Sequence, residues 1–210
     1  MPATERPLRR DAERNRQRIM AAAGELFTER GLCVTLDDIA HHAGVGVGTV
    51  YRRFPNKEVL IDALFERRLQ ALADLAEEAL AVDDPWQGIV QFFERACEQQ
   101  AHDRGLKELL ASGAHGGPCL DAARRLLRTT VGALFERAQL AGVVRADAAP
   151  QDAPLIHMML GVVMDRTRDV DPELWRRYLA LVLDGLRTDA APPLPVGPLS
   201  REQLDVVLTR

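Results

Sequence analysis

The stretch TLDDIAHHAGVGVGTVYRRF, from Thr35 to Phe54, constrains the fold of this chain more than any other part of it. Thr35 is followed three residues later by Asp38, which is typical of a capped helix start with an acidic first turn. The next apolar residues recur at i, i+3, i+4 and i+7, the spacing that one face of a short helix buries. They are Leu36, Ile39, Ala40 and Ala43. Gly44 can then adopt the left-handed conformation that ends a helix and turns the chain.

A second set of apolar residues at helical spacing follows this turn. Its members, which we expect to pack inward, are Val47, Val50, Tyr51 and Phe54. The side chains between them then face outward, and they are small, hydroxyl-bearing or cationic: Gly48, Thr49, Arg52 and Arg53. Two helices joined by a tight turn, with such a face on the second, are typical of a helix-turn-helix that reads DNA in the major groove.

The rest of the chain predicts helices and no strands. Apolar residues recur at helical spacing, and no stretch alternates apolar and polar residues as a half-buried strand does. The predicted helical segments are approximately residues 11–31, 57–80, 85–101, 106–111, 120–140, 153–168, 172–187 and 200–208. The predicted fold class is therefore all-α, with about nine main helices.

Composition and helix breakers divide the chain into four parts. We expect a flexible N-terminal arm, a helix-turn-helix DNA-binding domain, a larger helical domain, to which the family resemblance given below assigns ligand binding and dimerisation, and a C-terminal extension. Their bounds are 1–10, 11–56, 57–188 and 189–210. The extension begins as a linker, because four of the twelve prolines lie between Ala190 and Pro198. The short amphipathic segment after it (199–209) either docks on the body or lies loose, and the sequence leaves both open.

The net charge of −4 hides an asymmetry between the two ends of the chain. Residues 1–68 hold 12 Lys and Arg against 10 Asp and Glu, whereas the remainder holds 15 against 21. Eleven of those 12 cations are Arg, whose planar fork donates paired hydrogen bonds to phosphate and guanine. The excess of positive charge therefore coincides with the helix-turn-helix.

Cysteine usage and hydropathy place the chain in a reducing, aqueous compartment. The three cysteines, Cys33, Cys97 and Cys119, are far apart and odd in number, which is not a disulfide framework. The polar, Arg-rich N-terminus does not resemble a signal peptide, and no apolar run approaches the roughly 20 residues that span a bilayer. We expect a soluble, cytoplasmic protein with no membrane partner.

Several spaced groups of residues in this region resemble the TetR family of bacterial transcriptional regulators. They are Thr35, Asp38-Ile39-Ala40, Ala43-Gly44-Val45, Gly48-Thr49-Val50-Tyr51, Phe54-Pro55 and Asn56-Lys57-Glu58, with IMAAAGELFTERGL upstream. The resemblance covers roughly residues 12–65, under a third of the chain. It implies a homodimer of all-α subunits that binds double-stranded operator DNA, most often as a ligand-responsive repressor on a pseudo-palindrome, with no cofactor and no enzymatic activity.

The resemblance also implies roles for individual residues. Thr35 and Lys57 resemble positions that meet backbone phosphates, and Thr49 and Tyr51 resemble positions that contact phosphate or a base edge. Sequence choice would then fall on residues where the family varies, Arg52 and Arg53, with Gly48 on the same face.

Two residues at the start of the recognition helix depart from the family pattern. Gly46 stands where Ser is common, and Val47 stands where Lys is frequent. Glycine is a weaker cap than serine by a few tenths of a kcal/mol, so we expect a lost phosphate contact rather than a lost helix. Val47 either meets a thymine methyl or simply packs inside.

Aromatic and sulfur-bearing residues gather in the second domain, where an effector pocket would form. The candidate pocket residues are Trp86, Phe92, Phe93, Cys97, Leu126 and Met158, with Met159 and Met164 nearby. Residues of these types at helical spacing more often form core or dimer interface. The candidate interface, on the helices at 153–168 and 172–187, comprises Leu155, Met159, Val162, Val163, Trp175, Tyr178 and Val182. Two such helix pairs would make a four-helix bundle.

Other functions find less support in the sequence. A metal site from His102, Asp103, His115 and Cys119 matches no established ligand spacing, and Cys97 with Cys119 as a redox pair is less expected than two buried thiols. No catalytic set of residues supports an all-α enzyme. A DNA-binding regulator controlled by a protein partner, or by no effector, remains the principal alternative.

Overall fold

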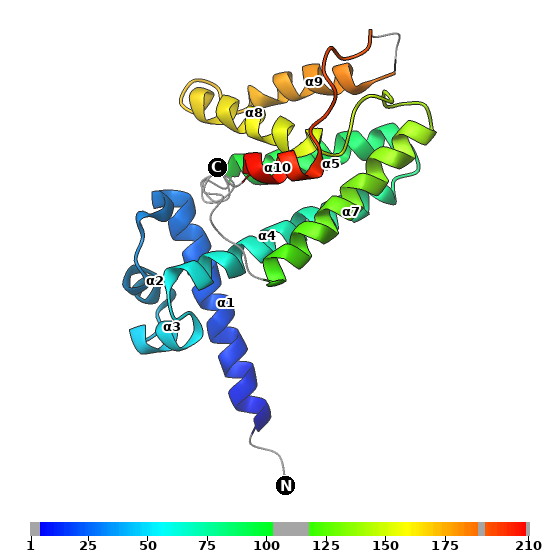
Figure 1. Ribbon diagram of the computed structural model, residues 1–210. Helices are drawn as coiled ribbons and strands as arrows, with labels where there is room; N and C mark the ends of the chain where they lie inside the picture. The colour runs from blue at the N-terminus through cyan, green and yellow to red at the C-terminus, as the bar shows by residue number, and fades with distance from the viewer. Residues whose placement is uncertain (1–4, 103–117, 189–191, 209–210) are drawn as a thin grey trace.

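The computed structural model describes residues 5–102, 118–188 and 192–208, and these residues form an all-α fold (Figure 1). Across the described ranges there are nine α-helices, which confirms the predicted fold class. They are α1 (Glu5–Arg30), α2 (Leu36–Ala43), α3 (Val47–Arg53), α4 (Lys57–Leu80), α5 (Pro85–His102), α7 (Pro118–Leu140), α8 (Asp152–Thr167), α9 (Trp175–Leu186) and α10 (Arg201–Leu208), with a 3-10 turn η1 (Gly31–Cys33) after α1. The helix predicted at 106–111 lies outside the described residues.

Two helix starts differ from the sequence prediction. The first helix begins at Glu5 rather than near Asp11, so residues 5–10 belong to α1 and not to an arm. Pro7 is compatible with this because proline is tolerated in the first turn of a helix, where no N–H is needed. The last large helix begins at Trp175 rather than beside Pro172. The Asp171 carboxylate instead accepts the Glu173 N–H at 3.0 Å and forms a turn before the helix.

The first hydrophobic core joins α1, α2 and α3 to the N-terminal half of α4. Its central residues include Phe27 of α1, Ile39 of α2, Val50 of α3 and Leu60 of α4, all fully buried. The N-terminal end of α7 contributes to the same core through Leu120 and Ala123. The helix-turn-helix is therefore held by elements from both halves of the chain.

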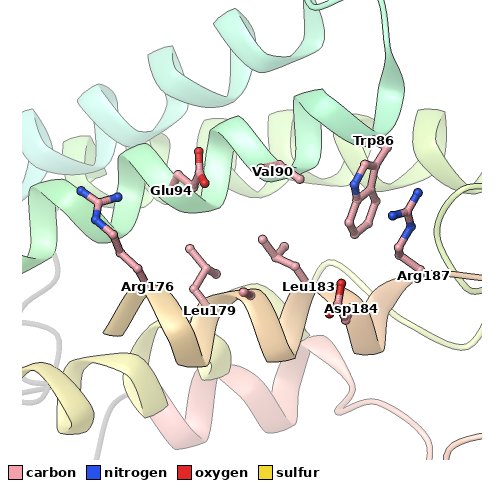
Figure 2. Close-up of a pocket in the computed structure, with 9 residues that line it drawn as sticks. Trp86, Val90, Glu94, Arg176, Leu179, Leu183, Asp184 and Arg187 are labelled. Atoms are coloured by element: carbon pink, nitrogen blue, oxygen red, sulfur yellow. The ribbon is translucent and has the colours of Figure 1, made fainter. Parts of the chain in front are cut away.

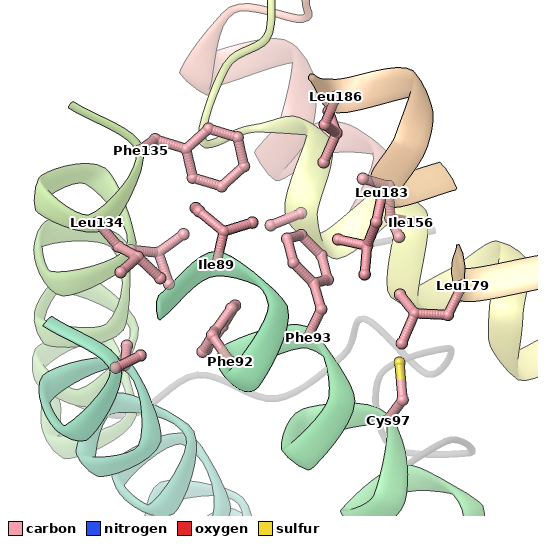
Figure 3. Close-up of a cluster of buried hydrophobic side chains, with 14 of the residues drawn as sticks. Ile89, Phe92, Phe93, Cys97, Leu134, Phe135, Ile156, Leu179, Leu183 and Leu186 are labelled. Carbon is pink, nitrogen blue, oxygen red and sulfur yellow. The ribbon is translucent and has the colours of Figure 1, made fainter. Parts of the chain in front are cut away.

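The second hydrophobic core joins the C-terminal half of α4 to α5, α7, α8 and α9 (Figure 3). Phe93 of α5 lies at its centre, with its ring edge-on to Phe92 at 5.5 Å and to Phe135 of α7 at 6.4 Å. Leu75 and Ala79 of α4 belong to this second core, whereas Leu60 and Leu64 belong to the first. One continuous helix, α4, therefore passes through both cores.

The C-terminal extension docks on the body, which answers the question that the sequence leaves open. Leu204 of α10 is buried, and Asp205 pairs with Arg128 of α7 at 2.9 Å. The linker before α10 is held by Arg145 and Asp147. Arg145 Nη2 donates to the Pro192 carbonyl at 2.8 Å, and Asp147 Oδ2 accepts the Leu194 N–H at 2.8 Å.

The α4–α5 contact generates a first prediction, at Gly88. A Cβ at this position would lie 2.6 Å from the Ala79 carbonyl oxygen, so Gly88→Ala forces α5 away from α4. We expect a loss of about 1–3 kcal/mol in the free energy of unfolding, measured by urea denaturation. Gly132→Ala on α7 is the matched control, because a Cβ there meets nothing within 4 Å. Equal stability of the two variants would contradict the close approach.

Candidate nucleic-acid interface

The start of α2 is fixed by a reciprocal capping box between Thr35 and Asp38. The Asp38 N–H donates to Thr35 Oγ1 at 3.1 Å, and the Thr35 N–H donates to Asp38 Oδ2 at 2.9 Å. The Thr35 hydroxyl also donates to Asp38 Oδ2 at 2.6 Å, and these hydrogen bonds hold the pKa of that carboxyl below its usual value. Because the hydroxyl proton is already engaged, a phosphate at this helix start would meet free backbone amides rather than Thr35 Oγ1.

The turn between α2 and α3 depends on Gly44, as the sequence predicts. Gly44 has φ of +62°, a left-handed conformation, and Val45 N–H closes the turn on the Ala40 carbonyl at 3.0 Å. Arg18 of α1 holds the same turn from outside. Its Nη2 donates to the carbonyls of Ala43 at 2.7 Å and Gly44 at 3.3 Å. The sequence analysis missed this role, because nothing local separates Arg18 from the other arginines of α1.

Helix α3 presents a different face from the one that periodicity predicts. Val50 and Phe54 are buried as expected, but Val47 is 44% exposed and Tyr51 is 48% exposed. The prediction that these two side chains pack inward is therefore wrong. Thr49, expected to face outward, is instead partly buried.

The outer face of α3 thus combines aliphatic, phenolic and cationic groups. Gly48, Arg52 and Arg53 are exposed, as predicted, beside Val47 and Tyr51. Arg52 Nη2 donates to Thr49 Oγ1 at 3.2 Å and so lies along the helix. A valine methyl suits a thymine methyl, and guanidinium groups suit guanine or phosphate, so this face has the chemistry of major-groove recognition.

Helix α4 begins at Lys57, a few residues after α3 ends at Arg53. Gly46, the residue before α3, provides no side-chain cap, whereas the Asn56 carboxamide caps α4 by accepting the Val59 N–H at 2.9 Å. The Lys57 ammonium lies 5.9 Å from the centre of the Phe27 ring of α1. Free amides and a lysine at one helix start favour an anion such as a backbone phosphate.

Comparison with known families agrees with this geometry. Residues 19–64 match the family model for bacterial regulatory proteins of the tetR family. Residues 84–188 match the model for the C-terminal domain of SbtR-like transcriptional regulators, which is half of the chain. The chain belongs to the TetR family. It is a helix-turn-helix DNA-binding regulator of transcription, in a family whose members are not enzymes.

Curated relatives of this TetR-family protein match part of its length. The HTH-type transcriptional regulator SAR0097 of Staphylococcus aureus (strain MRSA252) is 35% identical over 89 residues, which cover 41% of this chain and 46% of that protein. The regulator SAUSA300_2515 of S. aureus (strain USA300) is 41% identical over 63 residues, which cover 30% and 34% respectively. The chain thus spans less than half the length of these curated relatives.

Solved structures match the TetR-family chain over most of its length. A TetR transcription regulatory protein from Mycobacterium vanbaalenii is 35% identical, covers 86% of this chain and 99% of its own, and has a TM-score of 0.61. The TetR transcriptional regulator SCO0520 from Streptomyces coelicolor is 33% identical, covers 83% and 99%, and has a TM-score of 0.62. The likeness therefore extends through both domains of the regulator.

The residues that the sequence suggested for an effector pocket lie in different environments in the described part of the chain. Phe92, Phe93 and Cys97 are packed inside the second core, and burial raises the pKa of the Cys97 thiol to about 12. Leu126 is partly buried on α7, and Met158 is 40% exposed on α8. These side chains therefore lie mostly in the core or on the surface, where apolar residues at helical spacing are usually found.

A shallow groove of about 210 Å³ lies instead between α5 and α9 (Figure 2). Its apolar floor includes Trp86, Val90, Leu179 and Leu183. The Arg187 guanidinium stacks over the Trp86 ring at 4.7 Å. Of the residues that the sequence suggested for an effector pocket, Trp86 lines this groove.

The candidate interface residues separate into three groups by their exposure to solvent. Met159, Val162 and Tyr178 are exposed on α8 and α9, and the partly buried ones are Leu155, Val163 and Val182. Trp175, in contrast, is only 1% exposed and belongs to the second core, so it cannot contact another subunit directly. The Arg176 guanidinium covers the Trp175 ring at 4.4 Å.

Metal and membrane sites find no support in the described part of the regulator. Those residues contain no cluster of three or more His, Cys, Asp or Glu side chains that could hold a metal ion. The side chains of His102, Asp103, His115 and Cys119 lie outside what the structure describes. Among the described helices, none is both long and apolar enough to cross a bilayer.

The open surface around Gly48 generates a second prediction. A Cβ at Gly48 meets nothing within 4 Å, so Gly48→Gln should fold at least as stably as the wild type. On DNA the added side chain would occupy the space that a base edge needs, and we expect operator affinity to fall about tenfold or more. Fluorescence anisotropy on DNA that the wild type selects from a random pool measures this.

The same change at Gly132, which is equally open but lies on α7, is the control and should leave affinity unchanged. Wild-type affinity in Gly48→Gln would place the DNA-contacting face elsewhere on the regulator.

Proposed function

We propose that the protein is a homodimeric, effector-responsive repressor that binds a pseudo-palindromic operator. The observation that carries this proposal is an apolar face left uncovered on α8 and α9. Three side chains of this face, Met159, Val162 and Leu181, are each more than half exposed, with 55% for Met159 and 57% for the other two. Monomeric proteins rarely leave a contiguous apolar surface of this kind in water.

A second copy of the chain is the occupant that fits this face. Helices α8 and α9 contact each other within the subunit, and together they offer an apolar pair that can cross the same pair of a partner (Figure 1). Such a contact is self-complementary about a twofold axis and forms a four-helix bundle. A twofold dimer would in turn place two α3 helices on two half-sites, one helical turn of about 34–36 Å apart or a multiple of it.

Helix α4 supplies a route from an effector to the DNA. Its N-terminal half is buried against α1, α2 and α3, and its C-terminal half is buried against α5 and α7. Leu120 and Ala123 of α7 also enter the DNA-binding core. A change in the second core would therefore alter the spacing of the recognition helices, provided that the effector binds one arrangement more tightly than the other.

One observation favours a second candidate, in which a protein partner or no effector controls the regulator. The groove between α5 and α9 holds about 210 Å³, below the roughly 300–1,000 Å³ usual for small-molecule pockets. Aromatic side chains fill the core beside it. Small-molecule control therefore needs a site that opens as the ligand enters.

The dimer generates a third prediction, at Val162. Val162→Glu places a charge in the proposed interface, where an unpaired charge is expensive to bury. We expect a monomer in light scattering after size exclusion, with operator affinity reduced at least tenfold because each half-site is then bound alone. Val196→Glu, at another highly exposed valine in the linker, is the control and should remain dimeric. A dimeric Val162→Glu protein with wild-type affinity would rule out the α8–α9 interface.

A further inference from the structure

Two buried polar atoms at the seam between α5 and α8 have no hydrogen-bond partner among the described residues. They are Gln100 Oε1 on α5 and His157 Nε2 on α8. Leaving such an atom buried and unpaired costs about 1–3 kcal/mol, so each calls for an explanation. Trp175 Nε1 on α9 is also buried and has no hydrogen-bond partner among the described residues.

The Gln100 side chain has one hydrogen-bonding group without a partner among the described residues, and that group is an acceptor. The residue is 7% exposed, and its Nε2 donates to the backbone carbonyl of His157 at 3.2 Å. This hydrogen bond shows that the amide nitrogen, and not the amide oxygen, is directed at α8. The carboxamide oxygen is therefore the unpaired atom, and it can only accept hydrogen bonds.

His157 offers an acceptor as well. Its Nδ1 lies 3.0 Å from the Ala153 carbonyl oxygen, which can only accept, so the proton of the neutral ring is on Nδ1. Burial lowers the pKa of His157 below its ordinary value near 6.5, so the ring is neutral at pH 7. Nε2 is therefore a bare lone pair, although the residue as a whole is only partly buried.

The surroundings of His157 are aromatic and uncharged. Its ring stacks on Phe93 at 5.6 Å with an interplanar angle of 24°, and Phe92 lies 6.3 Å away. Burial lowers its pKa, the hydrogen bond to the Ala153 carbonyl opposes that shift, and no charged group contributes to it. The neighbouring Met158 is 40% exposed, so the seam lies just beneath the surface of α8.

We propose that Gln100 and His157 form the polar end of an effector site at the α5–α8 seam, and that the site takes an uncharged aromatic molecule bearing a hydroxyl or N–H donor. This inference rests on the proposed function, in which a small molecule controls DNA binding. Two acceptors without a cation repel carboxylates and phosphates, whereas a hydroxyl or N–H donor can pair with either atom. A planar ring system extends the stack of His157 on Phe93. Because α8 also carries the proposed dimer face, a molecule that separates α8 from α5 would move that face.

Two probes with the same naphthalene ring system test the class of effector, 2-naphthol as a neutral donor and 2-naphthoate as an anionic acceptor. At millimolar concentration 2-naphthol should raise the Tm of the full-length protein by about 3 °C and weaken binding to its selected DNA, while 2-naphthoate does neither. The proposal falls if 2-naphthol gives no shift or if 2-naphthoate stabilises the protein as well.

Variants of the two residues locate the site. His157→Phe keeps the ring and removes the acceptor, so the variant should melt at or above the wild-type temperature and lose the 2-naphthol shift. Gln100→Met removes the other acceptor at similar length and should also lose the shift. Gln99→Met, the same change on the exposed side of α5, should retain it. An unchanged 2-naphthol shift in both His157→Phe and Gln100→Met would overturn the assignment.

Two further readouts separate the possible failures. If Gln100 and His157 serve only to hold a buried water, His157→Phe lowers Tm and 2-naphthol has no effect on the wild type, which overturns the proposal. Binding to selected DNA without any probe tests the proposed function independently. A wild-type protein that selects DNA but ignores 2-naphthol contradicts only the effector site.

Discussion

The burial of one helix, α4, in two separate cores is the constraint on which the rest of the structure depends. Its first turns complete the helix-turn-helix core through residues such as Leu60, Leu64 and Leu69. Its last turns complete the second core through Leu75, Ala76 and Ala79. A helix of 24 residues extends about 36 Å at 1.5 Å per residue, and no glycine or proline interrupts it. The recognition helix is thus rigidly connected to the domain that carries the proposed dimer face.

This arrangement makes the DNA-binding end sensitive to packing far from it. Arg18 of α1 fixes the turn at Gly44, while Leu120 of α7 closes the same core from the other domain. Neither residue belongs to the helix-turn-helix itself, yet both help to set where α3 lies. A molecule that separates α5 from α8 would act on α5, which packs against α4 and α7, and so on the spacing of two recognition helices in the proposed dimer.

Local signals in the sequence were sufficient for the helix-turn-helix and for α4. Thr35 with Asp38, the left-handed Gly44 and the Asn56 cap each depend on a few neighbouring residues, and the structure places them as predicted. The exposed sides of α3 were not predictable in the same way. A helix of seven residues packs through few side chains, here Val50 with Phe54 just beyond it, so periodicity could not tell that Val47 and Tyr51 face outward.

The proposed effector site and the proposed interface depend on tertiary contacts that the sequence does not display. Phe92 and Phe93 form core because α5 lies between α4, α7 and α8, which no spacing along α5 reveals. Trp175 is likewise buried in the second core, which its spacing along the chain does not reveal. It is the first residue of α9, because the turn formed by Asp171 delays the start of that helix. The pairing of Gln100 with the His157 carbonyl spans 57 residues and emerges only from the fold.

Selection of bound DNA from a random pool tests the central claim most directly, because it reports both symmetry and spacing. A dimer whose recognition helices are held rigidly through α4 should enrich an inverted repeat with one fixed distance between half-site centres, about 10–10.5 base pairs or a multiple of it. Enrichment of a single half-site, or of repeats at several spacings with equal affinity, would contradict this account.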